Sequence, residues 1–359
     1  MPALDDIVTK RLKNLAERHQ QRILLESIRM DGVYVERGGK RYISFSCNDY
    51  LGLSQHPQVI EAAIEATKIY GAGAGASRLI TGNHPLYAQL EQTIAHQKKT
   101  EAALVLGSGY LANIGAIPAL VGRGDLIIAD KLAHACIMDG AHLSGATFKR
   151  FKHNDMQDLE RLLEARTDYA QCLIITDHVF SMDGDIAPLK AMRLLADKHN
   201  AWLMVDDAHG LGIVRPAAEP HIWMGTLSKA AGSYGGYIAG SQKLIDYLIT
   251  SARSFMFSTG LPPAIIAAAD AALKRMTPEL ASKALSNAKR FHPAAQSTIA
   301  PVILGDEVTA LEKSKALQAA GFLVQAIRPP TVPAGTARLR IAFSALHTEA
   351  MVNRLIKTL

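Results

Sequence analysis

Two short apolar runs near the middle of the chain each lead into side chains that can act as acids, bases or nucleophiles. The run at 202–205 ends in Asp206, with His209 three residues further on, and the run at 222–224 leads into GTLSKA, which contains Lys229. A short apolar block bounded by turn residues is typical of a buried strand. Open α/β sheets bind ligands at the carboxyl ends of their strands. We therefore expect a carboxylate, an imidazole and an amine to face one ligand site.

Asp206 and Lys229 are the pair of residues that pyridoxal 5′-phosphate (PLP) requires. A lysine just behind a buried strand is desolvated, which lowers its pKa and prepares its amine to form a Schiff base. A buried carboxylate needs a partner, and the protonated ring nitrogen of PLP supplies one. Taken singly, each residue has a plainer interpretation: a solvated lysine, and an aspartate that caps a helix or forms an ion pair.

Further polar residues follow other expected strands. Gly109 and Tyr110 lie in GSGY between a strand and a helix, where free N–H groups attract phosphate; a plain tight turn explains this motif equally well, and its spacing is not GxGxxG. His134 is placed to stack on a flat cofactor or simply to begin a helix. Ser181 and His209 follow strands and are placed to hydrogen-bond a ring oxygen.

Arginines near the C-terminus are candidates for binding a substrate carboxylate, because the guanidinium group pairs with it through two hydrogen bonds. Arg338 and Arg340 alternate along an expected strand, so both point to the same face. For at least one of them, a plain surface charge is the alternative. Arg328 is held by a rigid Pro-Pro turn.

The segments around these residues alternate between strands and helices from residue 85 to about residue 252. This alternation predicts βαβ units and a mainly parallel, doubly wound α/β sheet. One of its helices begins after Asn154 or Asp155, either of which is a suitable cap. An Ala-rich helix at 264–276 is expected to leave the sheet. A smaller α+β lobe follows, with a strand predicted at 322–327.

The predicted domain division has three parts. A basic amphipathic helix over 4–23 and a hairpin that turns at Gly38-Gly39 are expected to pack on the small domain. The boundaries are 1–47 for this N-terminal segment, 48–276 for the large cofactor-binding domain and 277–359 for the small C-terminal domain.

Composition and charge narrow the class of protein. The net charge is +6, but the lysines and arginines are scattered, so an anionic small molecule is favoured as ligand and nucleic acid is not expected. No apolar stretch reaches membrane-spanning length, and the first residues do not read as a secretory signal, so we expect no membrane association. Three well-separated cysteines argue against a disulfide framework or a metal site and suit the cytoplasm.

Several segments together resemble one enzyme family. They are NDYLGL (48–53), SRLITGNHPLYAQLE (77–91), SGYLAN (108–113), DKLAHAC (130–136), VFSMDGDIAPL (179–189), VDDAHG (205–210), GTLSKA (225–230) and IRPPTVPAGTARLR (327–340). In this order they resemble the α-oxoamine synthases, PLP-dependent transferases of fold type I (the aspartate aminotransferase fold), over nearly the whole chain. The segment IRPPTVPAG points to the branch that makes 8-amino-7-oxononanoate for biotin biosynthesis.

The resemblance implies the contacts of each candidate residue with the cofactor. Lys229 would hold PLP, Asp206 would pair with its ring nitrogen, and His134 would stack over its ring. His209 and Ser181 would contact the ring oxygen. The catalytic set would thus be Lys229, His134, Asp206 and His209. The other implied cofactor contacts are Gly109, Tyr110 and Thr226 and, from the second subunit of a homodimer, Ser258 and Thr259.

The resemblance also implies the substrate contacts. Asn48 and Arg340 would take the carboxylate of the amino acid, and Arg22 and Thr331 match positions near the acyl substrate. Arg328 joins them as a substrate-binding candidate. In this chain, Asp177-His178 replaces the Glu-Gly or Glu-Ser usual in the family.

The implied reaction is a decarboxylative condensation. L-Alanine would condense with a pimeloyl thioester, carried by CoA or by an acyl-carrier protein, to give 8-amino-7-oxononanoate, CO2 and free thiol. Glycine C-acetyltransferase is the first alternative within the family, ahead of 5-aminolevulinate synthase and serine palmitoyltransferase. A non-catalytic subunit of the same fold should lack Lys229, and a dinucleotide-binding oxidoreductase should contain GxGxxG.

Overall fold

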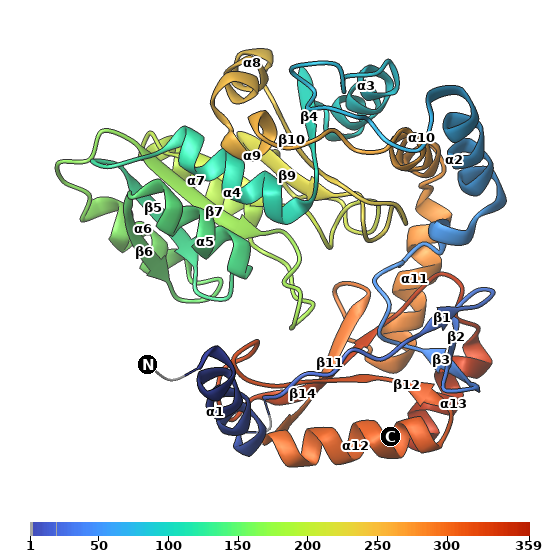
Figure 1. Ribbon diagram of the computed structural model, residues 1–359. Helices are drawn as coiled ribbons and strands as arrows, with labels where there is room; N and C mark the ends of the chain where they lie inside the picture. Colours follow the sequence, from blue (N-terminus) through green and yellow to red (C-terminus); the bar gives the residue numbers. More distant parts are fainter. Residues whose placement is uncertain (1–2, 19) are drawn as a thin grey trace.

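The structure is a computed structural model that describes residues 3–18 and 20–359. Its elements form two lobes, and helix α11 (Pro278–Phe291) runs from the upper lobe to the lower one (Figure 1). Helix α1 (Leu4–Glu17) lies at the edge of the lower lobe. Within the described part of the chain, every helix is too short or too polar to span a bilayer.

The upper lobe is built on a seven-stranded sheet of order β4-β10-β9-β8-β7-β5-β6. Its strands are β4 (Ala102–Leu106), β5 (Leu126–Asp130), β6 (Thr147–Phe151), β7 (Cys172–Asp177), β8 (Trp202–Asp206), β9 (Ile222–Thr226) and β10 (Gly236–Gly240). Strands β6, β5, β7, β8 and β9 pair in parallel, whereas β10 is antiparallel to both of its neighbours. The expected α/β class, with a mainly parallel sheet, is confirmed.

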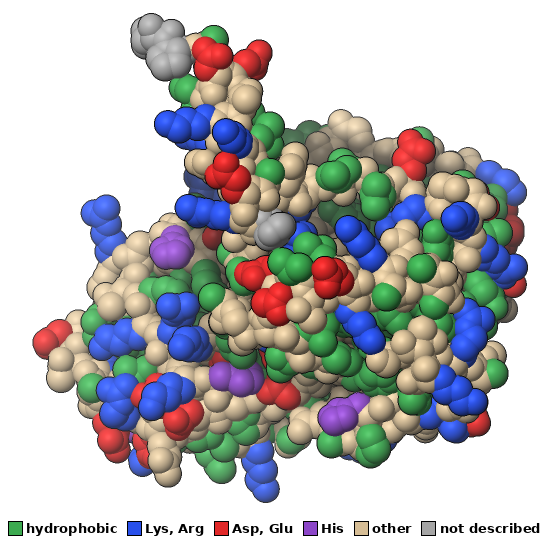
Figure 2. Space-filling model, turned by 90° about the horizontal axis from the view of Figure 1, so that it is seen from below, with side chains coloured by type: hydrophobic (Ala, Val, Ile, Leu, Met, Phe, Trp, Pro, Cys, Tyr) green, Lys and Arg blue, Asp and Glu red, His purple; other side chains and the backbone are tan. Residues whose placement is uncertain are grey.

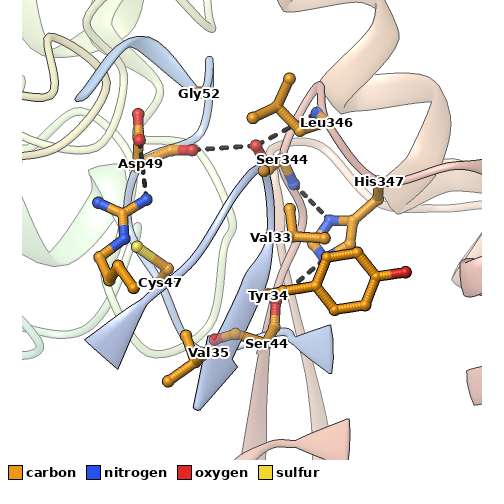
Figure 3. A pocket seen from close by; sticks show the side chains of 12 residues that line it. Val33, Tyr34, Val35, Ser44, Cys47, Asp49, Gly52, Ser344, Leu346 and His347 are labelled. Atoms are coloured by element: carbon orange, nitrogen blue, oxygen red, sulfur yellow. Dashed lines mark hydrogen bonds and ion pairs between the residues drawn. The ribbon is translucent and has the colours of Figure 1, made fainter. Parts of the chain in front are cut away.

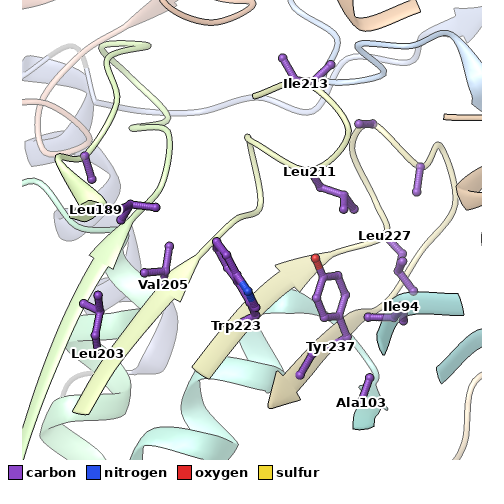
Figure 4. Close-up of a cluster of buried hydrophobic side chains, with 14 of the residues drawn as sticks. Ile94, Ala103, Leu189, Leu203, Val205, Leu211, Ile213, Trp223, Leu227 and Tyr237 are labelled. Carbon is purple, nitrogen blue, oxygen red and sulfur yellow. The ribbon is translucent and has the colours of Figure 1, made fainter. Parts of the chain in front are cut away.

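Both faces of this sheet are buried. Along β8, Leu203 and Val205 join one hydrophobic cluster, whereas Met204 joins the cluster on the opposite face. Trp223 and Tyr237 belong to the first cluster, together with Leu203 and Val205 (Figure 4). Successive side chains of a strand point to opposite faces, so a strand covered on both sides is apolar along its whole length. This explains the uninterrupted apolar runs that precede the polar residues in the sequence.

Helices cover the sheet and continue around its edge. They are α2 (Pro57–Tyr70), α3 (Leu86–Lys98), α4 (Gly109–Leu120), α5 (Ala135–Ser144), α6 (Met156–Glu164), α7 (Leu189–Lys198), α8 (Gln242–Ser251), α9 (Arg253–Met256) and α10 (Pro263–Leu273), with a 3-10 turn at Leu53–Gln55. The Asp155 side chain accepts a hydrogen bond from the Asp158 N–H at 3.0 Å. Asp155 is therefore the cap of α6, rather than Asn154.

The lower lobe contains two small sheets and two further helices. One sheet has the order β1-β2-β3-β12 and the other β11-β14-β13. The elements are β1 (Ile28–Arg29), β2 (Tyr34–Arg37), β3 (Lys40–Ser44), β11 (Ile299–Gly305), α12 (Glu307–Ala319), β12 (Phe322–Leu323), β13 (Gln325–Ile327), β14 (Ala337–Ala342) and α13 (Glu349–Thr358). Strand β3 pairs in parallel with β12, so the N-terminal hairpin shares a sheet with C-terminal residues. The division at 47/48 and 276/277 stays a prediction.

Three expectations about elements are wrong. The N-terminal helix ends at Glu17 instead of residue 23; none of its residues is buried, so no packing extends it. Helix α10 does not leave the upper lobe, because it packs against α2 and α3 through buried alanines. The unpredicted α11 makes that crossing. The apolar run at 322–327 is divided at Val324, since its two halves pair with different sheets.

A loop at 181–186 connects the lobes. From the lower lobe, Arg338 forms a 2.5 Å ion pair with Asp183. From the upper lobe, His153 binds Asp185 at 2.7 Å. The loop follows β7 and therefore brings the lower lobe to the carboxyl edge of the central sheet.

Candidate active site

Lys229 lies in the turn after β9, half-buried at the carboxyl edge of the parallel strands. Burial lowers the pKa of its amine, and the carboxylates of Asp206 and Asp177 oppose this effect. A lysine amine with a lowered pKa is available in its neutral form, which is required of a nucleophile or a base. The structure thus places Lys229 in the kind of environment that the sequence predicts.

Asp206 ends β8 and is buried. One carboxylate oxygen accepts a hydrogen bond from the Asn113 side chain at 3.0 Å, and the other accepts one from the Ala208 N–H at 2.9 Å. Burial raises the pKa of Asp206, and the electrostatic interaction with Lys229 opposes this effect. Asn113 of α4 thereby fixes the orientation of a carboxylate that lacks a countercharge in direct contact.

His134 precedes α5 as its cap. Its backbone N–H donates to Asp177 at 2.9 Å, and Asp177 is paired with Asp206 across the adjacent strands β7 and β8. Burial, together with the neighbouring Asp206, raises the pKa of Asp177 well above its usual range. Burial also lowers the pKa of His134, so its ring is neutral and suited to stacking. The His134 Nδ1 atom lies 2.8 Å from the Cys136 sulfur.

The start of α4 forms a cradle beside β9. Ser108 caps the helix by accepting the Leu111 N–H at 3.1 Å, so Gly109 and Tyr110 occupy the first turn, where backbone N–H groups point outward. A side chain on Gly109 would come within 3.3 Å of the Thr226 Cβ. Glycine at this position therefore leaves the helix start open to an anion, whereas the Thr226 hydroxyl donates to the Gly235 carbonyl at 2.8 Å. The Tyr110 hydroxyl itself binds Asp139 at 2.8 Å.

Arg340 is buried at the joint of the two lobes. Its Nε donates to the Ser181 carbonyl at 2.5 Å and its Nη1 donates to the Asn48 side chain at 3.1 Å. The structure brings Arg340 and Asn48 together, as expected, and Ser181 joins them through its backbone carbonyl; the contact of the Ser181 side chain with the cofactor stays a prediction. Arg338 is also buried rather than exposed, and Asp183 neutralises it. Arg340 is consequently the arginine of this pair that lacks a carboxylate in direct contact.

The three remaining substrate candidates form a separate group. The Arg22 guanidinium donates to the Thr331 hydroxyl at 3.1 Å across 309 residues of sequence. The Thr331 N–H donates to the Arg328 carbonyl at 3.1 Å. The role of these three residues in substrate binding stays a prediction.

Ser258 and Thr259 lie on a different segment. Thr259 forms a bridge with Ser77, and the Ser258 N–H reaches the Phe255 carbonyl at 3.5 Å. Both positions are at least partly exposed. Their expected contact with a partner's cofactor stays a prediction.

Tyr50 is a site residue that the sequence reasoning missed. Its hydroxyl lies 2.6 Å from His209 Nδ1 and accepts from Arg340 Nη2 at 3.2 Å. It therefore links the candidate carboxylate-binding group to His209. Tyr50 stands in the quoted segment NDYLGL, but only the fold reveals where its hydroxyl points.

A buried charged cluster lies behind Asp206. Asp207 forms ion pairs with Lys98 and with His178, and all three side chains are buried. The Lys98 ammonium also lies over the Trp223 ring, 4.6 Å from its centroid. Lys98 lowers the pKa of Asp207 despite burial. Of the two consecutive carboxylates, Asp207 is neutralised within the protein, whereas Asp206 is left for a cationic ligand.

A small cavity near the lobe joint is shown in Figure 3. It lies between the hairpin and the 344–347 turn, where Arg29 pairs with Asp49 at 3.0 Å. Its lining includes neither Lys229 nor Asp206. It is therefore not the candidate site.

The donor set fits PLP. A buried carboxylate, Asp206, suits a protonated ring nitrogen, and Lys229 is close enough for each to alter the pKa of the other. The N–H groups at the start of α4 suit a phosphate at the far end. The neutral imidazole of His134 suits stacking on the face of the PLP ring. Every part of the cofactor thus has a chemically matched group.

Comparison with known proteins agrees with this geometry. Residues 40–359 match the family model of class I and II aminotransferases, and the fold together with that match defines a PLP enzyme of fold type I. The chain is 53% identical over 366 residues to the 8-amino-7-oxononanoate synthase of Methylobacterium nodulans, covering 100% of this chain and 97% of the relative. It is 55% identical over 372 residues to a putative 8-amino-7-oxononanoate synthase of Caulobacter vibrioides, with 99% and 97% covered.

Solved structures extend the likeness. A serine palmitoyltransferase from S. paucimobilis with a bound PLP–myriocin aldimine superposes with a TM-score of 0.93 at 29% identity, covering 100% of this chain and 97% of that one. An 8-amino-7-oxononanoate synthase from Francisella tularensis gives 0.76 at 25% identity, covering 88% and 96%. The chain therefore belongs to the class I and II aminotransferase family and, within it, to the α-oxoamine synthases.

Proposed function

We propose that the protein condenses L-alanine with a pimeloyl thioester to form 8-amino-7-oxononanoate, CO2 and free thiol. One observation carries the proposal: buried Arg340 is joined through Tyr50 to His209, beside Lys229 with its lowered pKa. A carboxylate-binding group, a cofactor-facing imidazole and a base thereby share one network. This is the arrangement that an α-amino acid substrate requires.

Each residue then has a defined task. Arg340 and Asn48 bind the carboxylate of alanine. Lys229, whose pKa is lowered by burial, takes the proton from the α-carbon. When bound, PLP supplies the electron-withdrawing ring that accommodates the resulting negative charge. Asp206 would pair with the protonated ring nitrogen, and His134 would cover one face of the ring and exclude water from it.

The acyl donor is assigned to the side of Arg22 and Thr331. Their direct contact fixes an arginine at the position where a carboxylate or phosphate of the donor can bind. Both CoA and an acyl-carrier protein present such groups, and either carrier is compatible with the proposal.

Sequence identity favours the alanine and pimeloyl pair over other members of the family. The backbone superposes better on serine palmitoyltransferase, with a TM-score of 0.93, than on the solved 8-amino-7-oxononanoate synthase, with a TM-score of 0.76. The TM-score measures similarity in the fold and in the relative position of the lobes. Family members with different substrates share both of these features. The 53% and 55% identities to 8-amino-7-oxononanoate synthases extend along whole chains, far above the 29% to the palmitoyltransferase.

A substrate panel tests the assignment. The purified PLP-loaded protein is supplied with alanine, glycine or serine, each with pimeloyl-, acetyl- or palmitoyl-CoA, and thiol release is measured. We expect the highest kcat/KM for alanine with pimeloyl-CoA. Preference for glycine with acetyl-CoA would instead identify a glycine C-acetyltransferase, and preference for serine with palmitoyl-CoA a serine palmitoyltransferase.

We further propose a cytoplasmic homodimer. Helix α1 projects from the body of the protein (Figure 2) and exposes an apolar stripe. Burial of such a stripe against a second subunit would be favourable. The stripe consists of Leu4, Ile7, Val8, Leu12 and Leu15, each at least 40% exposed. Sedimentation should give twice the chain mass of 38.7 kDa. Val8→Glu should weaken the dimer, whereas Thr9→Glu on the polar face should not.

A further inference from the structure

Tyr50 occupies an unusual position for a residue with no assigned role. Its side chain is completely buried, at 0% exposure. Its single hydroxyl is within reach of three groups: His209 Nδ1 at 2.6 Å, Asn48 Oδ1 at 3.1 Å and Arg340 Nη2 at 3.2 Å. Two of these groups belong to the proposed substrate pocket and the third to the cofactor site.

The distances determine where the hydroxyl proton lies. Arg340 only donates, so Tyr50 accepts from it. The proton then goes either to His209 Nδ1 or to Asn48 Oδ1. Hydroxyl donors lie about 2.5–3.0 Å from their acceptors, and N–H donors about 2.7–3.2 Å. The 2.6 Å contact fits a Tyr50 O–H that donates to His209, whereas the 3.1 Å contact with Asn48 Oδ1 is the longer and weaker of the two.

This assignment fixes the tautomer of His209. Nδ1 is an acceptor, so in the neutral ring the proton must be on Nε2. Burial, together with electrostatic interactions with Lys229 and Arg340, lowers the pKa of His209 well below its usual range, so the ring is neutral. His209 therefore presents one N–H donor to the cofactor site.

The same hydroxyl limits the freedom of Arg340. Its Nε binds the Ser181 carbonyl, its Nη1 binds Asn48, and its Nη2 binds Tyr50. A guanidinium has five N–H donors. One hydrogen on each Nη therefore remains, and each can donate to a substrate carboxylate.

We propose that Tyr50 is a positioning residue that holds His209 as the Nε2–H donor and at the same time orients Arg340 toward the substrate carboxylate. The inference rests on the proposed function, because it assumes that His209 faces the ring oxygen of PLP and that Arg340 binds the amino acid. Tyr50 itself contacts neither ligand. It couples the two sites through one proton and one accepted hydrogen bond.

The test uses Tyr50→Phe in the PLP-loaded protein, with two readouts that need no acyl donor. The first is the apparent pKa of the bound cofactor, measured from its absorbance as a function of pH. A donor at the ring oxygen draws negative charge from the cofactor, so its loss should raise this pKa. The second is the Kd for L-alanine, which should rise about tenfold, as for loss of one hydrogen bond to a charged group.

A double-mutant cycle separates positioning from simple damage. In a His209→Asn background, Tyr50→Phe should no longer shift the cofactor pKa, since it acts through His209. Tyr237→Phe is the matched control: this tyrosine is also fully buried, its hydroxyl has no hydrogen-bond partner among residues 3–18 and 20–359, and its loss should leave both readouts unchanged.

The possible outcomes are distinct. An unchanged cofactor pKa in Tyr50→Phe, or an equal shift with and without His209, would overturn the inference while leaving the proposed function intact. An unchanged Kd for alanine in Tyr50→Phe would show that Tyr50 does not orient Arg340. Wild-type protein that binds no PLP would overturn both the inference and the proposed function.

Discussion

His347 makes the stability of the lower lobe dependent on pH. Its ring is buried and stacks on Phe45 with 4.0 Å between ring centroids. Nδ1 accepts the Ser344 N–H at 2.9 Å and Nε2 donates to the Ser44 carbonyl at 3.0 Å (Figure 3). A second proton on Nδ1 would face the Ser344 N–H. The fold therefore requires the neutral imidazole.

The size of the effect follows from proton linkage. Burial lowers the pKa of His347 from 6.5 to about 4. The unfolded chain thus binds more protons between these values, so the stabilisation is present above pH 6.5 and is lost as the pH falls toward 4. Lowering the pH from about 7.5 to about 5 should cost about 2 kcal/mol of unfolding free energy at this one residue.

Urea unfolding of wild-type protein and of His347→Gln at both pH values measures this cost. The variant is less stable at the higher pH, but it should lose about 2 kcal/mol less than wild type on acidification. His292→Gln, at an exposed histidine, should retain the wild-type pH response. Equal acid sensitivity of wild type and His347→Gln would refute the reasoning.

Two further substitutions test how the site is supported. Lys98→Met leaves buried Asp207 without its cation and should destabilise the protein by about 3–5 kcal/mol in urea unfolding; adding Asp207→Leu should restore part of this loss, and a further loss would contradict the ion-pair account. Gly184→Ala should lower the melting temperature, because Gly184 has a φ of +77° and a Cβ there would lie 2.1 Å from the Ile299 carbonyl oxygen. Gly124→Ala, at φ +92° with nothing within 4 Å, should have the smaller effect; equal losses would show that the contact is irrelevant.

The central groups of the site could be predicted from sequence for a physical reason. Asp206 and Lys229 directly follow apolar strands, and parallel strands deliver their carboxyl ends to the same edge of a sheet. His134 follows β5 in the same way. Once the runs were identified as strands, little freedom remained in where these side chains could lie.

Other contacts were beyond sequence reasoning, because they depend on the tertiary packing. Tyr50 and His209 are separated by 159 residues, and Lys98 and Asp207 by 109. No local pattern encodes such a distance. Helix α11 was missed while α10 was given its role, because the Ala-rich composition of α10 indicates a helix but not what it packs against. The division of the run at 322–327 likewise reflects competition between two sheets.

The most direct test of the proposed reaction follows the carbon atoms of the amino acid. Wild-type protein and Lys229→Ala are each loaded with PLP and given pimeloyl-CoA and L-alanine labelled in its carboxyl carbon. The account predicts that wild type releases the label as CO2 in equal amount to free thiol and unlabelled 8-amino-7-oxononanoate, and that Lys229→Ala releases none. Thiol release without labelled CO2, or undiminished turnover by Lys229→Ala, would contradict it.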